Sequence, residues 1–267
     1  TRTSSSAASD VYKRQFLVYA LIRFKNVYMQ QYLFKRVRAF PDRSKKFLID
    51  QVKKELPDFD VDKHFTPRYN PWEQRMCLIP NSDFFEAIKN KTATVVTDHI
   101  ESFEEKGIKL KSGDFLDADI IVTATGLVLQ NFGGVTISIN NNPVNVSDTM
   151  TYKSLMYSDI PNFVNSFGYI NASWTLKADL TSVYLCRLIK HMDKNEYSSA
   201  CPRKPLDVDE TYDWLKDFSS GYIQRSINLH PQQGSKKPWV NYQDYIKDWI
   251  DVKFSKLEDG NLIFSRD

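Results

Sequence analysis

Apolar residues recur at helical spacing near the start of the chain. The spacing i, i+3, i+4, i+7 is the period of one face of an α-helix, and it is followed by Leu17, Ala20, Leu21, Phe24, Val27 and Tyr28. Pro41-Asp42 interrupts the pattern, and residues 44–55 resume it. Because proline ends a helix or opens a new one, the pattern predicts two consecutive helices.

These two helices are basic. Residues 16–56 hold ten Lys and Arg against three Asp and Glu. Such a segment could bind a membrane surface or a nucleic acid. The alternative is a solvated helix face, which we favour because the positive charges are dispersed over both helices.

Residues 57–80 are dense in proline and aromatic side chains and predict a loop. Bulky residues in such a loop can order it over a cofactor or a domain interface, and simple loop packing is an equal alternative. A short helix is expected over 82–90.

Beyond residue 93 the apolar period changes to two, which is typical of strands with one solvated face. The strands are expected at 94–96, 99–104 and 108–111, with turns at 105–107 and at Ser112-Gly113. The pattern predicts a three-stranded antiparallel meander.

A continuous apolar run, Ile120 to Val122, predicts a strand buried on both faces. It thins at once to Thr-Ala-Thr-Gly, ending at Gly126. Small residues at the carboxyl end of a strand let the backbone approach a ligand, and this end is where α/β sheets bind ligands.

A second buried strand is expected over 161–169, followed by a short loop and a helix over about 175–192. The inward stripe of this helix is Leu176, Leu180, Val183, Tyr184 and Leu188. Ser173 or Thr175 is its expected N-cap. A helix N-terminus after a tight loop can bind an anion or an electron-rich ring, although a plain connection without a ligand remains the commoner case.

The last segment predicts one more helix and a closing strand at 262–264. The apolar stripe of this helix, which we expect to face the core, consists of Tyr242, Tyr245, Ile246, Trp249 and Ile250.

The residue composition excludes several kinds of binding site from this chain. The nine glycines include no G-x-G pair, and none precedes residue 107, so a dinucleotide fingerprint and a P-loop are both excluded from this chain. The four histidines show no metal-ligand spacing, and a net charge of +3 is too weak to imply nucleic acid. Three distant cysteines are expected as free thiols in a reducing compartment, the cytoplasm.

Four stretches together carry a family resemblance. They are KHFTPRYNPWEQRMC at 63–77, VVTDHIESFEEKGIKLKSGDFLDADIIVTATG at 95–126, PNFVNSFGYINASWTLKADL at 161–180 and QGSKKPWVNYQDY at 233–245. The chain resembles class B flavoprotein monooxygenases, the flavin-containing and Baeyer–Villiger enzymes, and among these the EthA-type group. The resemblance covers nearly all of 16–267.

The resemblance implies an α/β fold, the C-terminal part of a flavoprotein with two Rossmann-like FAD/NAD(P)-binding domains. Residues 16–122 would be the end of the NADPH-binding domain with a helical linker and the meander. Residues 123–267 would be the returning segment of the FAD-binding domain. Residues 1–15, whose Ser/Ala-rich composition matches nothing downstream, are expected to be an extraneous or disordered leader.

The function implied is that of an FAD- and NADPH-dependent monooxygenase. Through a C4a-(hydro)peroxyflavin it would insert one oxygen of O₂ beside a ketone carbonyl, or oxidise the soft centre of a thioether or an amine. The family's catalytic arginine would lie upstream, and we assign that role to neither Arg68 nor Arg75; this chain alone is expected to be inactive. No nucleic-acid partner is expected, and a peripheral membrane contact stays open.

The resemblance also implies a set of FAD-binding positions. They are Ala124, Thr125, Gly126, Leu127, Asn171, Ser173, Trp174 and Thr175. Backbone N–H groups around Ser173 to Thr175 would face the N1/O2 edge of the flavin and stabilise its negative charge when it is reduced.

Two alternatives remain. A related FAD-dependent pyridine-nucleotide reductase would need a redox cysteine pair, and the chain has no C-x-x-C. A non-enzymatic basic helical module binding a membrane or nucleic acid through 16–56 would leave the meander and the 120–126 run unexplained.

Overall fold

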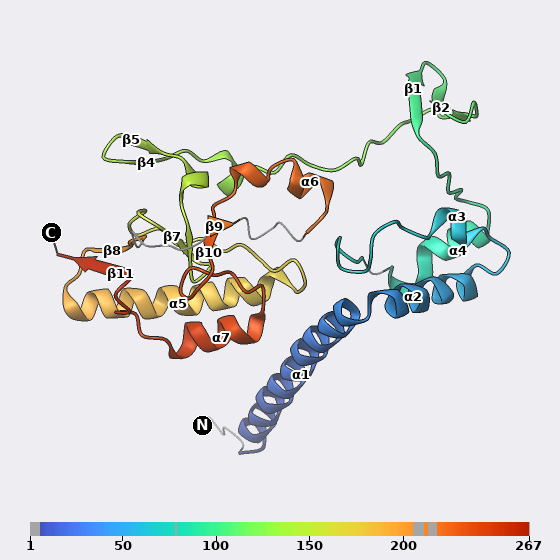
Figure 1. Cartoon of the computed structure of the whole chain (residues 1–267). Helices are drawn as coiled ribbons and strands as arrows, with labels where there is room; N and C mark the ends of the chain where they lie inside the picture. The colour runs from blue at the N-terminus through green and yellow to red at the C-terminus, as the bar shows by residue number, and fades with distance from the viewer. Residues whose placement is uncertain (1–5, 78, 205–210, 213–217, 267) are drawn as a thin grey trace, which may run out of the picture. The chain divides into compact units, whose positions relative to one another are not determined.

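The computed structural model describes residues 6–77, 79–204, 211–212 and 218–266. The chain divides into two compact units (Figure 1). Unit 1 consists of Thr1–Ala39, Gln130–Asp217 and Gln224–Asp267, and unit 2 of Phe40–Leu129 and Phe218–Ile223.

The helices of unit 2 include α2 (Pro41–Glu55), α3 (Val61–His64) and α4 (Asp83–Lys89). Helix α2 begins with Pro41, whose fixed φ suits the first turn. Asp42 lies in that first turn and lysines lie in the last, as the helix dipole favours. The two predicted helices at 44–55 and 82–90 are therefore confirmed. They enclose a small apolar core formed by Leu56, Val61 and Ile88.

The predicted antiparallel meander is present, but one of its strands was misplaced. Its strands are β1 (Ile100–Glu104), β2 (Gly107–Leu110) and β3 (Phe115–Asp117), in that order. The third strand thus follows Gly113, and residues 94–96 form no strand. The reason is that Val95 packs against the helical core of unit 2 instead of alternating between two sheet faces.

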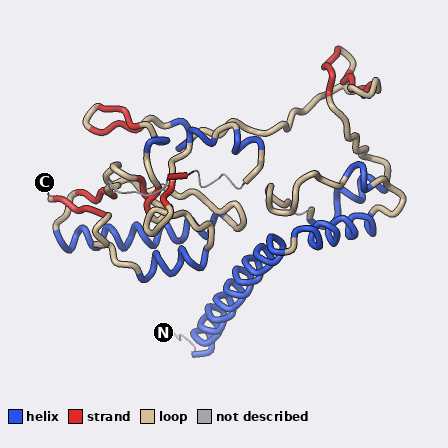
Figure 2. Tube along the Cα trace, in the orientation of Figure 1, coloured by secondary structure: helices blue, strands red, loops and turns tan. Residues whose placement is uncertain are grey.

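No strand forms over 118–129, which run as the loop after β3 (Figure 2). Ile120 and Val122 are 82% and 84% exposed, so the predicted buried strand is wrong for this chain. A strand needs neighbours for its backbone groups, and among the described residues no other strand pairs with this stretch.

Unit 1 contains the long helices. They are α1 (Ser6–Ala39), α5 (Trp174–Asn195) and α7 (Tyr245–Phe254). The four-residue α6 (Gly221–Gln224) crosses the boundary of the units. Helices α5 and α7 pack side by side (Figure 1). Helix α1 begins inside the segment that we expect to be a leader, and the origin of that segment remains a prediction.

The strands of unit 1 form two-stranded antiparallel pairs: β4 (Ile137–Ile139) with β5 (Asn142–Val144), β6 (Thr151–Tyr152) with β7 (Met156–Tyr157), β8 (Ser199–Pro202) with β11 (Leu262–Ser265), and β9 (Thr211–Tyr212) with β10 (Gln233–Gly234). The closing strand is confirmed as β11. The strand predicted over 161–169 is wrong, because this segment is held by single backbone bonds, such as Asn165 N–H to Leu155 O, rather than by a ladder.

The main core of unit 1 lies between α5 and the short strand pairs. Its buried members are Met150, Tyr152, Leu155, Met156, Leu180, Tyr184, Leu188, Ala200, Trp239, Val252 and Leu262. The predicted inward stripe of α5 is confirmed, since four of its residues are buried and Val183 packs against this core.

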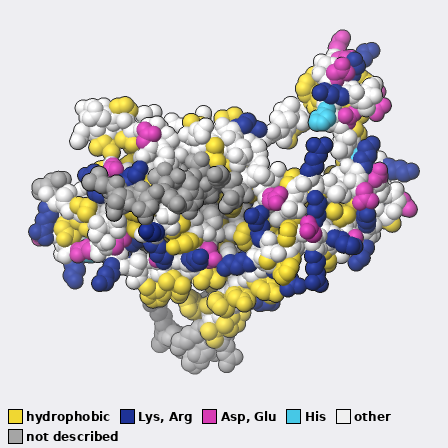
Figure 3. Space-filling view, viewed as in Figure 1, with side chains coloured by type: hydrophobic (Ala, Val, Ile, Leu, Met, Phe, Trp, Pro, Cys, Tyr) yellow, Lys and Arg dark blue, Asp and Glu magenta, His cyan; other side chains and the backbone are white. Residues whose placement is uncertain are grey.

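Two apolar helix faces are more exposed than the periodicity predicts. On α7 the buried residues are Asp248 and Val252, whereas Ile246, Trp249 and Ile250 are exposed. On α1, exposed apolar side chains gather along the helix (Figure 3). The helix was predicted correctly, but a period does not say whether its apolar face is covered. No described helix is long and apolar enough to cross a bilayer.

The mixture of helices and strands is compatible with the predicted α/β class. All strand pairings between named strands in the described part of the chain are antiparallel. A parallel dinucleotide-binding sheet and the assignment of 16–122 and 123–267 to two cofactor domains therefore remain predictions.

Candidate functional site

The N-terminus of α5 is uncapped by side chains. Ser173 occupies the N-cap position with extended φ and ψ of −64° and 135°, as predicted, but its hydroxyl makes no cap hydrogen bond. Its Oγ lies 2.8 Å from Oγ1 of Thr175 instead. Within the described residues, the backbone N–H groups of Trp174 and Thr175 have no hydrogen-bond acceptor. Two donors and the positive end of a 22-residue helix dipole are thus available to a ligand.

Asn171, in the turn before this helix, supplies an unused acceptor. The residue is only 3% exposed, and its Nδ2 donates to the backbone O of Gln243 at 2.9 Å. Its Oδ1 is buried and has no partner in the described part of the chain. An unpaired buried acceptor costs about 1–3 kcal/mol, so this atom is an expected place for a ligand donor.

Aromatic rings flank the same turn. The Trp174 indole is half-exposed, and the Phe167 ring lies 5.2 Å from it, centroid to centroid. The Phe167 ring also meets the His230 ring edge-on at 6.2 Å. Trp174 packs directly on the backbone of Gly168, which explains why glycine follows Phe167 here. The turn therefore combines free N–H donors with apolar ring surface.

A buried ion pair lies one turn into α5. Lys177 Nζ lies 2.7 Å from Asp248 Oδ2 on α7, with side chains 2% and 7% exposed. The Tyr169 hydroxyl donates to the same oxygen, also at 2.7 Å. Burial lowers the pKa of Lys177 although Asp248 opposes the shift, and burial together with Asp248 raises the pKa of Tyr169.

Sequence reasoning missed this pair. Lys177 stands three and seven residues before Leu180 and Tyr184, on the inward face of α5. A lysine at such a position was the available signal. Nothing in the sequence pattern indicated that its partner would be Asp248, which lies 71 residues later.

Helix α1 contacts the same region of unit 1. Gln30 Nε2 donates to the backbone O of Asn171 at 3.4 Å, and Val27 packs against Tyr169, Ala172 and Leu176. Lys35 Nζ lies 3.0 Å from Asp244, the N-cap residue of α7. The basic face of α1 is therefore partly used within the fold.

The predicted FAD-binding residues fall into two groups. Asn171, Ser173, Trp174 and Thr175 lie together at the α5 N-terminus in unit 1. Ala124, Thr125, Gly126 and Leu127 lie in the extended loop of unit 2, all exposed, with Gly126 at a φ of 101°. The structure brings the first group together.

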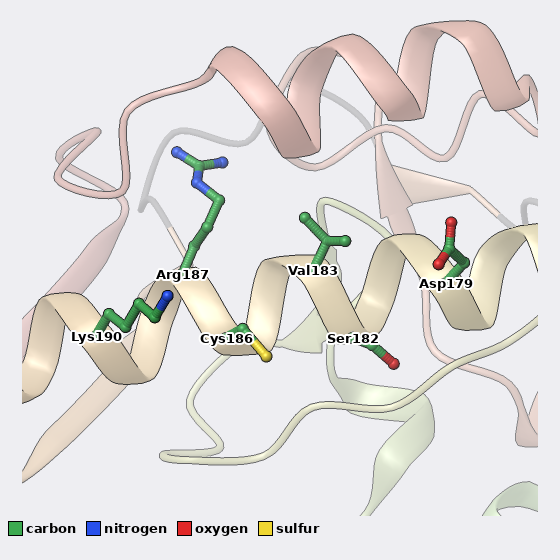
Figure 4. A pocket seen from close by; sticks show the side chains of 6 residues that line it. All are labelled: Asp179, Ser182, Val183, Cys186, Arg187 and Lys190. Carbon is green, nitrogen blue, oxygen red and sulfur yellow. The ribbon is translucent and has the colours of Figure 1, made fainter. Parts of the chain in front are cut away.

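An open groove of about 340 Å³ runs along a different part of α5 (Figure 4). The residues that line it all belong to α5: Asp179, Ser182, Val183, Cys186, Arg187 and Lys190. Arg187 already donates to the backbone O of Val252 and of Ser255. The lining of the groove begins at Asp179, five residues beyond Trp174, about 7.5 Å along a helix axis. The groove is therefore separate from the α5 N-terminus.

Comparison with known proteins supports the predicted class. No family model matches the chain. The proteins similar to it over nearly its whole length are named FAD-containing or FAD-binding monooxygenases, so the predicted resemblance to flavoprotein monooxygenases is confirmed.

Three relatives illustrate the similarity. The FAD-containing monooxygenase EthA of Mycobacterium tuberculosis is 44% identical over 252 residues, 94% of this chain and 51% of the relative. EthA of Mycolicibacterium smegmatis is 43% identical over 97% of this chain and 52% of its own length. The probable FAD-binding monooxygenase AlmA of an Acinetobacter species is 41% identical over 93% and 50%. The chain thus spans about half the length of the curated relatives it matches.

Proposed function

We propose that this chain supplies part of the FAD site of an NADPH-dependent monooxygenase, and that the α5 N-terminus binds the flavin ring. The observation that carries the proposal is the uncapped turn of α5, where the Trp174 and Thr175 N–H groups and Asn171 Oδ1 have no partner among the described residues. The names of the relatives, which state FAD, support the choice of ligand.

The residues present fit a flavin ring. Its pyrimidine edge carries hydrogen-bond acceptors that gain negative charge on reduction, and it also carries one N–H donor. Free backbone N–H groups at a helix N-terminus suit the acceptors, and a buried carboxamide oxygen such as Asn171 Oδ1 suits the donor. The half-exposed Trp174 offers apolar surface to the ring.

When bound, FAD supplies the redox chemistry and the activation of O₂. The chain's own residues bind the flavin ring and stabilise charge at its edge. The N–H groups of Trp174 and Thr175 stabilise negative charge at the ring edge, and the dipole of α5 adds to this. The neighbouring rings of Phe167 and Trp174 place apolar surface beside that edge. The backbone at Ala124 to Leu127 is proposed to pass beside the same cofactor.

The finer description of the reaction rests on the family resemblance. The complete protein would take electrons from NADPH and insert one oxygen of O₂ beside a ketone carbonyl, or oxidise a thioether or amine. In this proposal the chain is the C-terminal part of a protein with two Rossmann-like domains, located in the cytoplasm. The alternative of a basic helical module binding a membrane or nucleic acid leaves the similarity to monooxygenases unexplained.

A pair of substitutions tests the site at its backbone. Trp174→Pro removes one N–H donor, and Ser173 already has the extended φ and ψ that precede proline. Trp174→Ala removes the indole but keeps the N–H. In the complete gene product that contains this chain, we expect Trp174→Pro to bind FAD at least tenfold more weakly than Trp174→Ala, because a hydrogen bond to a charged group is worth about 1.5–3 kcal/mol.

The measurement is the FAD dissociation constant, followed by quenching of flavin fluorescence. Equal FAD affinities of the two variants would show that the backbone N–H at position 174 does not contribute to FAD binding. A complete wild-type protein that binds no FAD would overturn the whole proposal.

A further inference from the structure

The buried pair of Lys177 and Asp248 lies where an apolar contact would be expected. Both side chains are almost fully buried between α5 and α7, next to the cluster of Tyr169, Ala172 and Leu176. Replacing a buried ion pair by well-packed apolar residues is often neutral or stabilising, whereas breaking it is costly. The fold alone therefore gives little reason to have a salt bridge here.

The pair is connected to both ends of the turn that contains the proposed flavin contacts. Asp248 Oδ2 receives hydrogen bonds from Tyr169, at the start of the turn, and from Lys177, in the first turns of α5. The ammonium group also lies 5.5 Å from the centroid of the Tyr169 ring. Residues 170–176 are thus enclosed between two groups that share one carboxylate oxygen.

The segment before α7 fixes the middle of the same turn. Gln243 Oε1 accepts from the Ile170 N–H, and the Gln243 backbone O accepts from Asn171 Nδ2, both at 2.9 Å. Asp248 N–H in turn donates to the backbone O of Asp244 at 3.0 Å. The direction of the free N–H groups of Trp174 and Thr175 therefore depends on how α7 is held against α5.

We infer that Lys177, Asp248 and Tyr169 are positioning residues for the flavin site, which fix the 170–176 turn so that its free N–H groups meet the ring edge. The inference rests on the proposed function, because the proposed function is what identifies that turn as a flavin contact. An ion pair suits this task since its charge-assisted hydrogen bonds are short and directional.

The test separates positioning from plain stability with a double substitution. In the complete gene product, Lys177→Met and Asp248→Asn each leave one buried charge without its counter-charge, and both are expected to lower the melting temperature. Asp248→Leu would also leave the buried Tyr169 hydroxyl without its acceptor, so the double substitution Lys177→Met with Asp248→Leu is made in the Tyr169→Phe variant, which serves as its reference. It removes both charges and should restore the melting temperature to that of the reference. We expect this double variant still to bind FAD at least fivefold more weakly and to change the fine structure of the bound flavin absorption spectrum.

A matched control is Asp179→Asn on the same helix. Asp179 pairs with Arg23 at 2.9 Å, but both side chains are substantially exposed. The FAD affinity and the flavin spectrum of the Asp179→Asn variant should therefore equal those of the wild type.

The outcomes are distinct. A double variant with the stability, FAD affinity and flavin spectrum of the Tyr169→Phe reference would overturn the positioning role while leaving the proposed FAD site standing. A double variant that stays as unstable as the single variants would also overturn it, because the pair would then be needed for the fold itself. A wild-type protein without FAD would instead refute the proposed function.

Discussion

The indole of Trp174 lies against the α-carbon of Gly168. A Cβ atom added at Gly168 would collide with Trp174 Cγ, far inside van der Waals contact. Glycine is therefore required at this position by a side chain six residues later, and Gly168 and the first residue of α5 are packed against each other.

The first prediction follows from this contact. Gly168→Ala should displace the Trp174 indole and destabilise the protein by about 1–3 kcal/mol, the usual range for overpacking. Because the indole moves with the first turn of α5, FAD affinity should fall as well. Thermal unfolding and FAD titration of the complete gene product measure both effects.

A second-site change provides the control. Trp174→Ala removes the ring with which the new methyl group collides, so adding Gly168→Ala to Trp174→Ala should cost less than 0.5 kcal/mol, within the usual additivity error of about 0.3–0.5 kcal/mol. If the two substitutions were simply additive, with the full cost of Gly168→Ala retained, the collision would not be the cause.

Helices with a sustained 3.6-residue period were predictable, because the apolar residues that define the buried face, as on α5, all lie in one continuous stretch of sequence. The strand at Ile120 to Val122 was not, because a strand needs partners that lie elsewhere, and the described part of the chain offers none. The residues at 171–175 could be predicted only through the family resemblance. Whether their N–H groups and the Oδ1 of Asn171 have partners depends on the three-dimensional arrangement of the chain, which the sequence pattern does not show.

The pair of Lys177 and Asp248 shows a second limit of periodicity. A period treats every charged residue as solvent-facing, so a buried ion pair appears as two polar positions. On α7 this assumption assigns the wrong residues to the buried face, since Asp248 is buried while Trp249 and Ile250 are exposed.

The second prediction concerns pH and Asp244, the N-cap of α7. Its Oδ1 accepts from the N–H groups of Ile246 and Lys247, and Lys35 Nζ lies 3.0 Å from its other oxygen. Burial alone would raise the pKa of this carboxyl group, but Lys35 and the two amides outweigh burial and lower the pKa. The ionised form therefore stabilises the folded state.

Asp244→Asn keeps a cap acceptor and removes the charge. Since the folded pKa lies below the unfolded value of about 3.9, the stability advantage of the wild type should be complete well above that value. It should disappear as pH falls through the folded pKa. We expect an advantage of about 0.5–1 kcal/mol near pH 7, seen in melting temperatures between pH 3 and pH 7. A gap that widens on acidification would contradict this account.

The last prediction concerns the main core of unit 1. The Tyr152 hydroxyl donates to Asp259 Oδ2 at 2.7 Å, and Lys153 Nζ lies 3.2 Å from the same oxygen. Burial raises the pKa of Asp259, but Tyr152 and Lys153 lower it more, so the carboxylate is ionised in the fold. Tyr152→Phe removes one hydrogen bond to this charge and should cost about 1.5–3 kcal/mol.

Tyr184→Phe is the matched control for that substitution. Tyr184 is buried in the same core, and its hydroxyl lies close to that of Tyr152 but forms no hydrogen bond of normal length and angle with a described residue. Removing an unpaired buried hydroxyl should leave stability unchanged or raise it, because a desolvated group without a partner is a cost to the fold. The free energy of unfolding of the two variants, measured at pH 7, therefore separates the hydrogen bond to Asp259 from the general effect of losing a phenolic oxygen. Equal losses in both variants would show that the carboxylate of Asp259 gives the Tyr152 hydroxyl no special role.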